Sequence, residues 1–228
     1  SRNPYSSSTL ARVLTGALAL FGSRAADAAN ALTPSAAVQT ACGVSGASQY
    51  WTTSAGDDAR FANNDGLVNL AASLGYSPAK IYQWVYDNVD FDVSWGSFQG
   101  AQTTLKSRLG NSVDQSSLLL AMLRASGYPA RYANAMAQFD MFNDPRLWYW
   151  VKTDSVNGAW GLLTGSYPIS AGGASTQRLP GIAQVPSSNY LKLPMMWVEV
   201  CVPYTNYRGS ASDTTGYRWV PMVPAFKS

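Results

Sequence analysis

The residues best suited to chemistry stand where a polar loop meets an apolar stretch. Ser112 follows Gly110 and Asn111 and precedes the helix that apolar residues predict over 113–126. A nucleophile at a helix N-terminus gains about 1 kcal/mol from the helix dipole, which is far too little to ionise a hydroxyl. Ser112 would therefore need a neighbouring base for acyl transfer. The chain has no histidine, so imidazole cannot serve as that base, as a metal ligand or as a proton shuttle.

A longer pattern surrounds this serine, because residues 110–132 read GNSVDQSSLLLAMLRASGYPARY. This segment resembles the signature of the transglutaminase-like superfamily. In that family a loop glycine and a nucleophilic Cys precede a buried Leu-rich helix and the motif Arg-Ala-x-Gly-x-Pro-Ala-Arg-Tyr. Downstream, MMWVEV at 195–200 is similar to the family's His-x-Trp-Val-Glu-Val strand. The segment GYRWVPMVP at 216–224 is similar to its Gly-x-x-Trp-x-Pro-Leu-Asp-Pro strand, so the resemblance covers residues 66–227.

The resemblance implies a reaction for which this chain lacks the necessary groups. The family's mechanism needs a Cys thiolate at the helix N-terminus, a His on the adjacent strand as base and acid, and an Asp on the next strand that orients the His. Carried over position by position, these places hold Ser112, Met195 and Val223. A thioether and an isopropyl group transfer no protons. The resemblance therefore implies a pseudo-enzyme, in which the Cys-His-Asp triad has been replaced.

Other residues of the motif are expected around the lost triad. The residues that we expect to line this relic cleft are Asn111, Asp114 and Trp197. Asp114 is either a leftover site carboxylate or, on the plainer interpretation, a first-turn carboxylate that stabilises the N-terminus of its own helix. Trp197 is expected to contribute mainly to the core.

An acyl-transfer enzyme, such as a transglutaminase, amidase or protease, is the alternative. Ser112 could act with a lysine if a buried lysine were held in its neutral form beside it, or the replacements could be inactivating substitutions in an active parent. Lys106 and Lys192 lie near the motif segments in sequence. Long lysine side chains usually keep their ammonium groups in water, so the non-catalytic interpretation is preferred.

Helix patterns come before strand patterns along the chain. Residues 65–75 predict a helix that is capped by Asp65 and ended by Gly75, and residues 77–88 predict a second helix with Pro78 in its first turn. The stripe that this second helix should bury comprises Ile81, Trp84, Val85 and Asn88. The segment 113–126 is apolar all round, so we expect it at the centre of the fold.

The remaining segments complete an α+β pattern. Residues 89–111 predict a loop with one short element, and residues 140–190 predict loops and short strands. Strands are predicted over 196–203 and 217–223, where β-branched and aromatic residues gather. Helices followed by strands indicate an α+β fold. Combined with the family resemblance, this order of elements predicts a papain/transglutaminase-like core in which a central buried helix packs on an antiparallel sheet.

The first 65 residues are expected to form an N-terminal extension before a transglutaminase-like domain over 66–228. The stretch from Leu10 to Phe21 is apolar and is followed by small residues, so it resembles a secretory signal and is too short to span a bilayer as a helix. If it is retained, it is expected to be a helix that docks on its own domain or on a neighbouring subunit. The rest of the extension predicts an irregular linker.

Composition favours a protein that works outside the cell. Only 13% of the residues are charged, and the net charge of +3 comes without a basic run, which gives nucleic-acid binding little support. Cys42 and Cys201 belong to no Cys/His cluster, so we expect no metal site and no cofactor. They form either one disulfide in an oxidising compartment or two buried free thiols. Residues 100–105 and 202–209 also resemble domains of secreted bacterial Rhs/YD-repeat proteins.

These features predict a secreted or cell-surface interaction module. One form is a self-assembling, filament-forming subunit that associates through the segment from Leu10 to Phe21. Another form binds a peptide or a glycan in the relic cleft. The aromatic residues of 147–150 are expected in surface loops, because such residues favour protein contacts. Neither a nucleic-acid partner nor a membrane span is expected.

Overall fold

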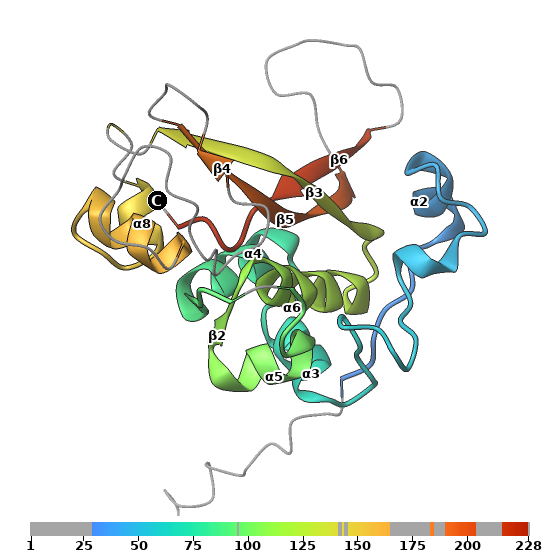
Figure 1. The fold of residues 1–228 in the computed structure, drawn as a ribbon. Coiled ribbons are helices and arrows are strands. Elements are labelled where there is room, and N and C mark those ends of the chain that lie inside the picture. Colours follow the sequence, from blue (N-terminus) through green and yellow to red (C-terminus); the bar gives the residue numbers. More distant parts are fainter. Residues whose placement is uncertain are drawn as a thin grey trace, which may run out of the picture.

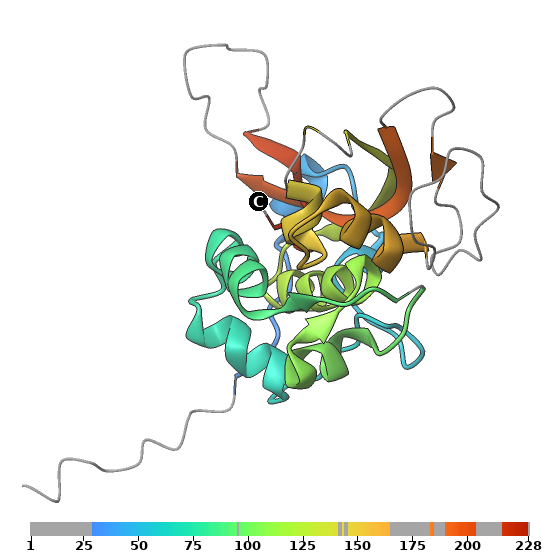
Figure 2. The same ribbon diagram turned by 60° about the vertical axis from the view of Figure 1, so that its left-hand side comes forward.

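The computed structural model describes most of the chain, namely residues 29–94, 96–140, 143, 146–164, 183–184, 190–203 and 216–227. The apolar stretch from Leu10 to Phe21 lies outside these residues, as does much of the 140–190 region. Within the described residues, an antiparallel sheet lies over a layer of helices (Figure 1), and the turned view keeps this arrangement (Figure 2).

Four helices form the layer beneath the sheet: α3 (Gly66–Ser73), α4 (Pro78–Asn88), α5 (Gly100–Ser107) and α6 (Ser112–Ala125). The predicted boundaries of α3 are confirmed. The Asp65 carboxylate accepts a hydrogen bond from the Val68 amide at 2.8 Å, and the chain leaves the helix at Gly75, whose φ of +69° favours glycine.

Two predictions about this layer are wrong. Asn88 was expected on the buried stripe of α4, but it is exposed and its side-chain amide donates to the Trp84 carbonyl at 2.9 Å. Helix α5 occupies a region expected to be mostly loop. Its eight residues bury only Gly100, Ala101 and Thr104 completely, which is too small and too polar a set to produce a helical hydrophobic period.

Helix α6 lies at the centre of the fold, as its sequence predicts. Every residue from Asp114 to Ala125 is buried. One side of α6 packs against strands of the sheet and the other against α3, α4 and α5. A helix in this position contributes more residues to the main apolar core than any other element, and the core joins its leucines to Ile81 and Val85 of α4 and to Val198 and Val200 of the sheet.

The sheet has a central strand, β5 (Tyr190–Pro203), with antiparallel neighbours β3 (Ala130–Asp140), β6 (Tyr217–Met222) and the short β4 (Ala183–Gln184). Strand β3 pairs with β5 along its whole length, from Ala130 opposite Val200 to Asp140 opposite Tyr190. The two predicted strands are confirmed within β5 and β6. Together with the helices, they confirm the α+β fold.

Two helices replace part of the region that was expected to hold loops and short strands. These are α7 (Arg146–Trp150) and α8 (Val156–Thr164). They cover one end of the sheet, where Trp150 and Leu163 pack in an apolar cluster with Leu191 and Leu193 of β5. The aromatic residues around 147–150 are therefore not all on the surface, since Tyr149 is 69% exposed but Trp150 only 2%.

The described part of the N-terminal extension begins on the helical layer, where the Ala29 amide donates to the side chain of Asn69 in α3, and it reaches the sheet at Cys42. It holds α2 (Ala36–Ala41) and a single 3₁₀ turn, η1 (Ser48–Tyr50). Cys42 and Cys201 form a disulfide across 159 residues of sequence. Around it, Trp51 of the extension and Trp219 of β6 pack together with the disulfide, and the Trp219 indole donates to the Cys42 carbonyl at 3.3 Å. Among the described residues, no helix is both long and apolar enough to cross a bilayer.

Replacing both cysteines with alanine should lower the free energy of unfolding by about 3–5 kcal/mol, because the bond closes a very long loop in the unfolded chain. Thermal or urea unfolding of the wild type and of Cys42→Ala/Cys201→Ala measures this change. A reducing agent should destabilise the wild type by a similar amount and leave the double variant unaffected. Equal sensitivity of both proteins to the reductant would contradict the disulfide.

Candidate functional site

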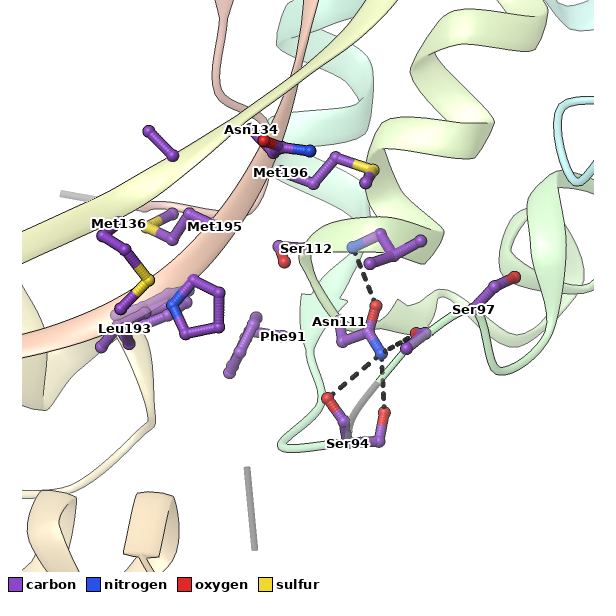
Figure 3. Close-up of a pocket in the computed structure, with 15 residues that line it drawn as sticks. Phe91, Ser94, Ser97, Asn111, Ser112, Asn134, Met136, Leu193, Met195 and Met196 are labelled. Carbon is purple, nitrogen blue, oxygen red and sulfur yellow. Dashed lines mark hydrogen bonds between the residues drawn. The ribbon is translucent and has the colours of Figure 1, made fainter. Parts of the chain in front are cut away.

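The N-terminus of α6 opens into a cleft of about 490 Å³. Its walls come from the start of α6, residues 94, 96 and 97 of the preceding loop, strand β3 and the middle of β5, and they are completed by Phe91 and by Trp150 of α7 (Figure 3). Ser112 and Met195, the places of the family's nucleophile and base, both line it. The structure therefore brings these two predicted positions together.

Asn111 sets the geometry of the serine. Its side-chain oxygen accepts hydrogen bonds from the amides of Val113 and Asp114, at 2.8 and 3.0 Å, and so caps α6. Its side-chain nitrogen donates to the carbonyls of Ser94 and Gly96, at 3.1 and 2.7 Å, which ties the loop to the helix start (Figure 3). Asn111 lines the cleft as predicted, and it acts there as a structural clamp.

Gly110, which precedes Asn111, is required because the neighbouring elements pack closely around it. Strand β1 (Asp90–Phe91) pairs in parallel with β2 (Leu109–Gly110), which leads directly into α6. A Cβ atom at Gly110 would lie 2.8 Å from the Asp114 Cβ atom and 3.2 Å from a methyl group of Thr104. The loop glycine of the motif therefore allows α5, β2 and α6 to approach one another.

The wall opposite Ser112 is formed by the sheet. Met195 is only 6% exposed and packs into the apolar cluster that contains Trp150 and Leu193. Val223, the place of the orienting acid, packs against the same cluster but does not line the cleft. Of the three triad places, a hydroxyl and a thioether therefore line the cleft, and an isopropyl group packs against the adjoining apolar cluster.

No charged or titratable side chain lines the cleft within the described part of the chain. Lys106 and Lys192, the possible bases, are both exposed and lie outside its walls. Burial lowers the pKa of Lys227 to about 8, yet its ammonium donates to the carbonyls of Val85 and Tyr86 at the end of α4. The geometry thus brings no lysine to the serine.

Asp114 does not line the cleft, so its placement in the relic site was wrong. Its Oδ1 atom accepts hydrogen bonds from the amides of Phe98, Gln99 and Gly100, at 3.1, 3.0 and 3.3 Å. The carboxylate is completely buried. It therefore holds the entry to α5 by charge-assisted bonds and does not cap its own helix through its side chain.

Trp197 is the second residue that was wrongly assigned to the cleft wall. It follows the cleft-lining Met196 on β5, and its half-buried side chain lies outside the cleft. Its indole N–H is buried and has no acceptor among the described residues.

Several cleft residues were missed by sequence reasoning. Phe91, Asn134, Met136 and Trp150 all line the cleft. Phe91 and Trp150 come from regions expected to be loops, and Asn134 and Met136 belong to a strand that was not predicted. The alternation of Ala133, Ala135 and Ala137 with their larger neighbours in β3 was the available signal, because period-2 patterns indicate strands.

The comparisons with known proteins give one match. A family model described as the transglutaminase-like superfamily matches residues 64–224. This range contains α3 to α8, the whole sheet and every residue of the cleft. No curated protein and no solved structure matches the chain.

Removing the Asp114 carboxylate should destabilise the protein by about 2–4 kcal/mol, because three amides lose a buried, charged acceptor. Urea unfolding of Asp114→Ala measures the change. Asp154→Ala is the matched control, since Asp154 is exposed and its loss should cost less than about 0.5 kcal/mol. Similar values for the two variants would show that Asp114 does not anchor the loop before α5.

Proposed function

The chain belongs to the transglutaminase-like superfamily, and we propose that it is a catalytically silent member that acts outside the cell as a protein-interaction module. One observation carries this proposal: the cleft at the N-terminus of α6 holds Ser112 and Met195 and has no titratable group in its described walls. On this proposal, the site at the N-terminus of α6 keeps its place in the fold but holds no side chain that could accept and return a proton.

The chemistry of the three positions supports the absence of catalysis. A serine hydroxyl is far less acidic than a cysteine thiol, and the helix dipole alone supplies about 1 kcal/mol toward its ionisation. Met195 cannot accept the proton of Ser112, and Val223 cannot orient a base. The acyl-transfer alternative, in which Ser112 acts with Lys106 or Lys192, is not favoured, because both lysines are exposed and outside the cleft.

Two features support an extracellular setting. Disulfides persist mainly in oxidising compartments, and Cys42 is joined to Cys201 in the folded protein. The low share of charged residues leaves a surface of neutral polar and aromatic groups. The resemblance to secreted bacterial Rhs/YD-repeat proteins agrees with this setting, and we include secretion or cell-surface display in the proposal.

The interaction that we propose is self-association. The stretch from Leu10 to Phe21 is the most apolar part of the N-terminal 65 residues, and its apolar side chains need a surface to cover them. Binding to a neighbouring copy would give a head-to-tail contact, and such contacts build open filaments when the rotation does not close.

The wild-type protein should neither crosslink a glutamine-containing protein to an amine donor nor release ammonia from it, because no base reaches Ser112. Amine incorporation measured by mass spectrometry, together with an ammonia assay, tests this. Activity that disappears in Ser112→Ala would overturn the proposal.

Restoring the family residues provides a positive control for the site geometry. In Ser112→Cys/Met195→His the new thiol should react with iodoacetamide near neutral pH about tenfold faster than in Ser112→Cys alone, because an adjacent imidazolium favours the thiolate. Equal rates would mean that positions 112 and 195 do not face each other closely enough for proton transfer.

A further inference from the structure

Strand β3 has one unpaired edge among the described residues. Its eleven residues pair with β5 on one side, and no described strand pairs with the other side. In an antiparallel pair, alternate residues direct their backbone N–H and C=O groups away from the partner. These groups form a row at which another extended chain can be added.

The edge lacks the features that usually protect exposed strands. From Tyr132 to Phe139 it contains no charged residue and no proline, and its register with β5 runs without a bulge. Asn134, Ala135 and Met136 are exposed in succession, and Met136 is 50% exposed. Natural edge strands are commonly blocked by lysine, proline or a bulge. Within the described part of the chain, this edge is therefore open to pairing.

The cleft reaches the same edge. Three consecutive residues of β3, Asn134 to Met136, line it. Because successive side chains point to opposite faces, a cavity that touches three in a row also borders the strand's backbone. A strand added to β3 would thus pass beside the cleft and could place a side chain in it. The methionines at 136, 195 and 196 give the cleft soft, adaptable walls that suit an aliphatic side chain.

The edge and the cleft together define the ligand as an extended, uncharged peptide with a large aliphatic residue. The chain itself contains such a segment. Residues Leu14 to Phe21 read LTGALALF, carry no charge and lie between Arg12 and Arg24. Leu18 and Leu20 alternate with alanines, so in an extended conformation both would face the same side. This segment lies outside the described residues.

The place where the described chain begins favours a neighbouring copy as the acceptor. Ala29 is joined to α3, since its amide donates to the side chain of Asn69 at 3.3 Å, and its carbonyl accepts from the amide of Asn64 just before the helix at 2.8 Å. Helix α3 packs on α6 in the layer beneath the sheet, away from β3 (Figures 1 and 2). The eight residues from Phe21 to Ala29 span at most about 28 Å, which leaves little length for a path around the helical layer to the chain's own β3 edge.

We propose that the segment Leu14–Phe21 of one copy adds as a strand to the β3 edge of a neighbouring copy and places a leucine in its cleft. This inference rests on the proposed interaction function and identifies both partners of the contact. The contact is head-to-tail, because the donor segment and the acceptor edge are different parts of the chain.

The test uses three variants of the full chain and sedimentation across about 1–100 µM protein, a range that detects micromolar association. Met136→Lys charges the acceptor edge, and Leu18→Lys/Leu20→Lys charges the donor segment. Leu32→Lys is the matched control, because Leu32 is 43% exposed and lies beside Ser126 at the opposite end of α6. Wild type and the control should associate, and each of the other two variants alone should associate at least about tenfold more weakly.

Mixing the two impaired variants gives the decisive measurement. Met136→Lys keeps an intact donor and Leu18→Lys/Leu20→Lys keeps an intact acceptor, so the mixture should form heterodimers that stop at two chains. A symmetric pairing of two β3 edges would not be restored in this way. The inference would be overturned if the wild type were monomeric, if either variant associated as well as the wild type, or if the mixture did not associate. It would also be overturned if the mature protein lacked the first 28 residues.

The two proposals can fail separately. The crosslinking assay is run on the same wild-type sample, and activity there would refute the silent-site proposal whatever the state of association. An inactive monomer would refute only the strand exchange. Near-ultraviolet circular dichroism of Met136→Lys checks that its cleft remains folded, and the donor variant tests the contact without altering the cleft.

Discussion

The complete burial of α6 is the constraint on which the rest of the structure depends. A polar group removed from water must find its partner within the protein, so the polar residues of this helix determine what lies around it. Asp114 binds the loop before α5, and Gln115 donates to the carbonyls of Asp90 and Gly110. Ser116 donates to the Met196 carbonyl of β5 at 3.1 Å.

Near the other end of α6, the Arg124 guanidinium donates to the Ala130 and Thr52 carbonyls and pairs with Asp57 at 3.3 Å. One helix thereby positions the loop, the sheet and the N-terminal extension.

The same constraint explains which parts could be predicted from the sequence. Helix α6 and strand β5 have strong apolar or β-branched patterns, because both contribute to the main core, and the three triad places follow from the resemblance to the family's motifs. Strand β3 lies at an edge of the described sheet, so its mixture of alanine, asparagine and glutamine carries little signal. Helix α5 buries few apolar side chains, and the Asp114 carboxylate binds the backbone at its start. Asp114 and Trp197 were misplaced because neighbouring residues in a sequence can face different sides of the same element.

On the proposed function, the cleft has lost the chemistry of the family's site and kept its place in the fold. Asn111 still caps α6 and holds the 94–97 loop, and Gly110 still allows the elements to approach closely. These contacts depend on backbone geometry, which a change at Ser112 does not disturb. Met195 and Val223 pack into the cluster around Trp150, where apolar side chains stabilise the fold more readily than unpaired polar ones. These two side chains therefore fit the folded structure, and on the proposed function they leave the site without a means of proton transfer.

The distance in sequence between the two cysteines has a consequence for biosynthesis. Cys42 is synthesised 159 residues before its partner Cys201. A product that terminates between these two positions carries an unpaired thiol at position 42, whereas a chain that includes Cys201 has no free cysteine among its described residues. In an export pathway that retains or degrades molecules with reactive thiols, this bond would discriminate chains that extend beyond residue 201 from those that terminate before it.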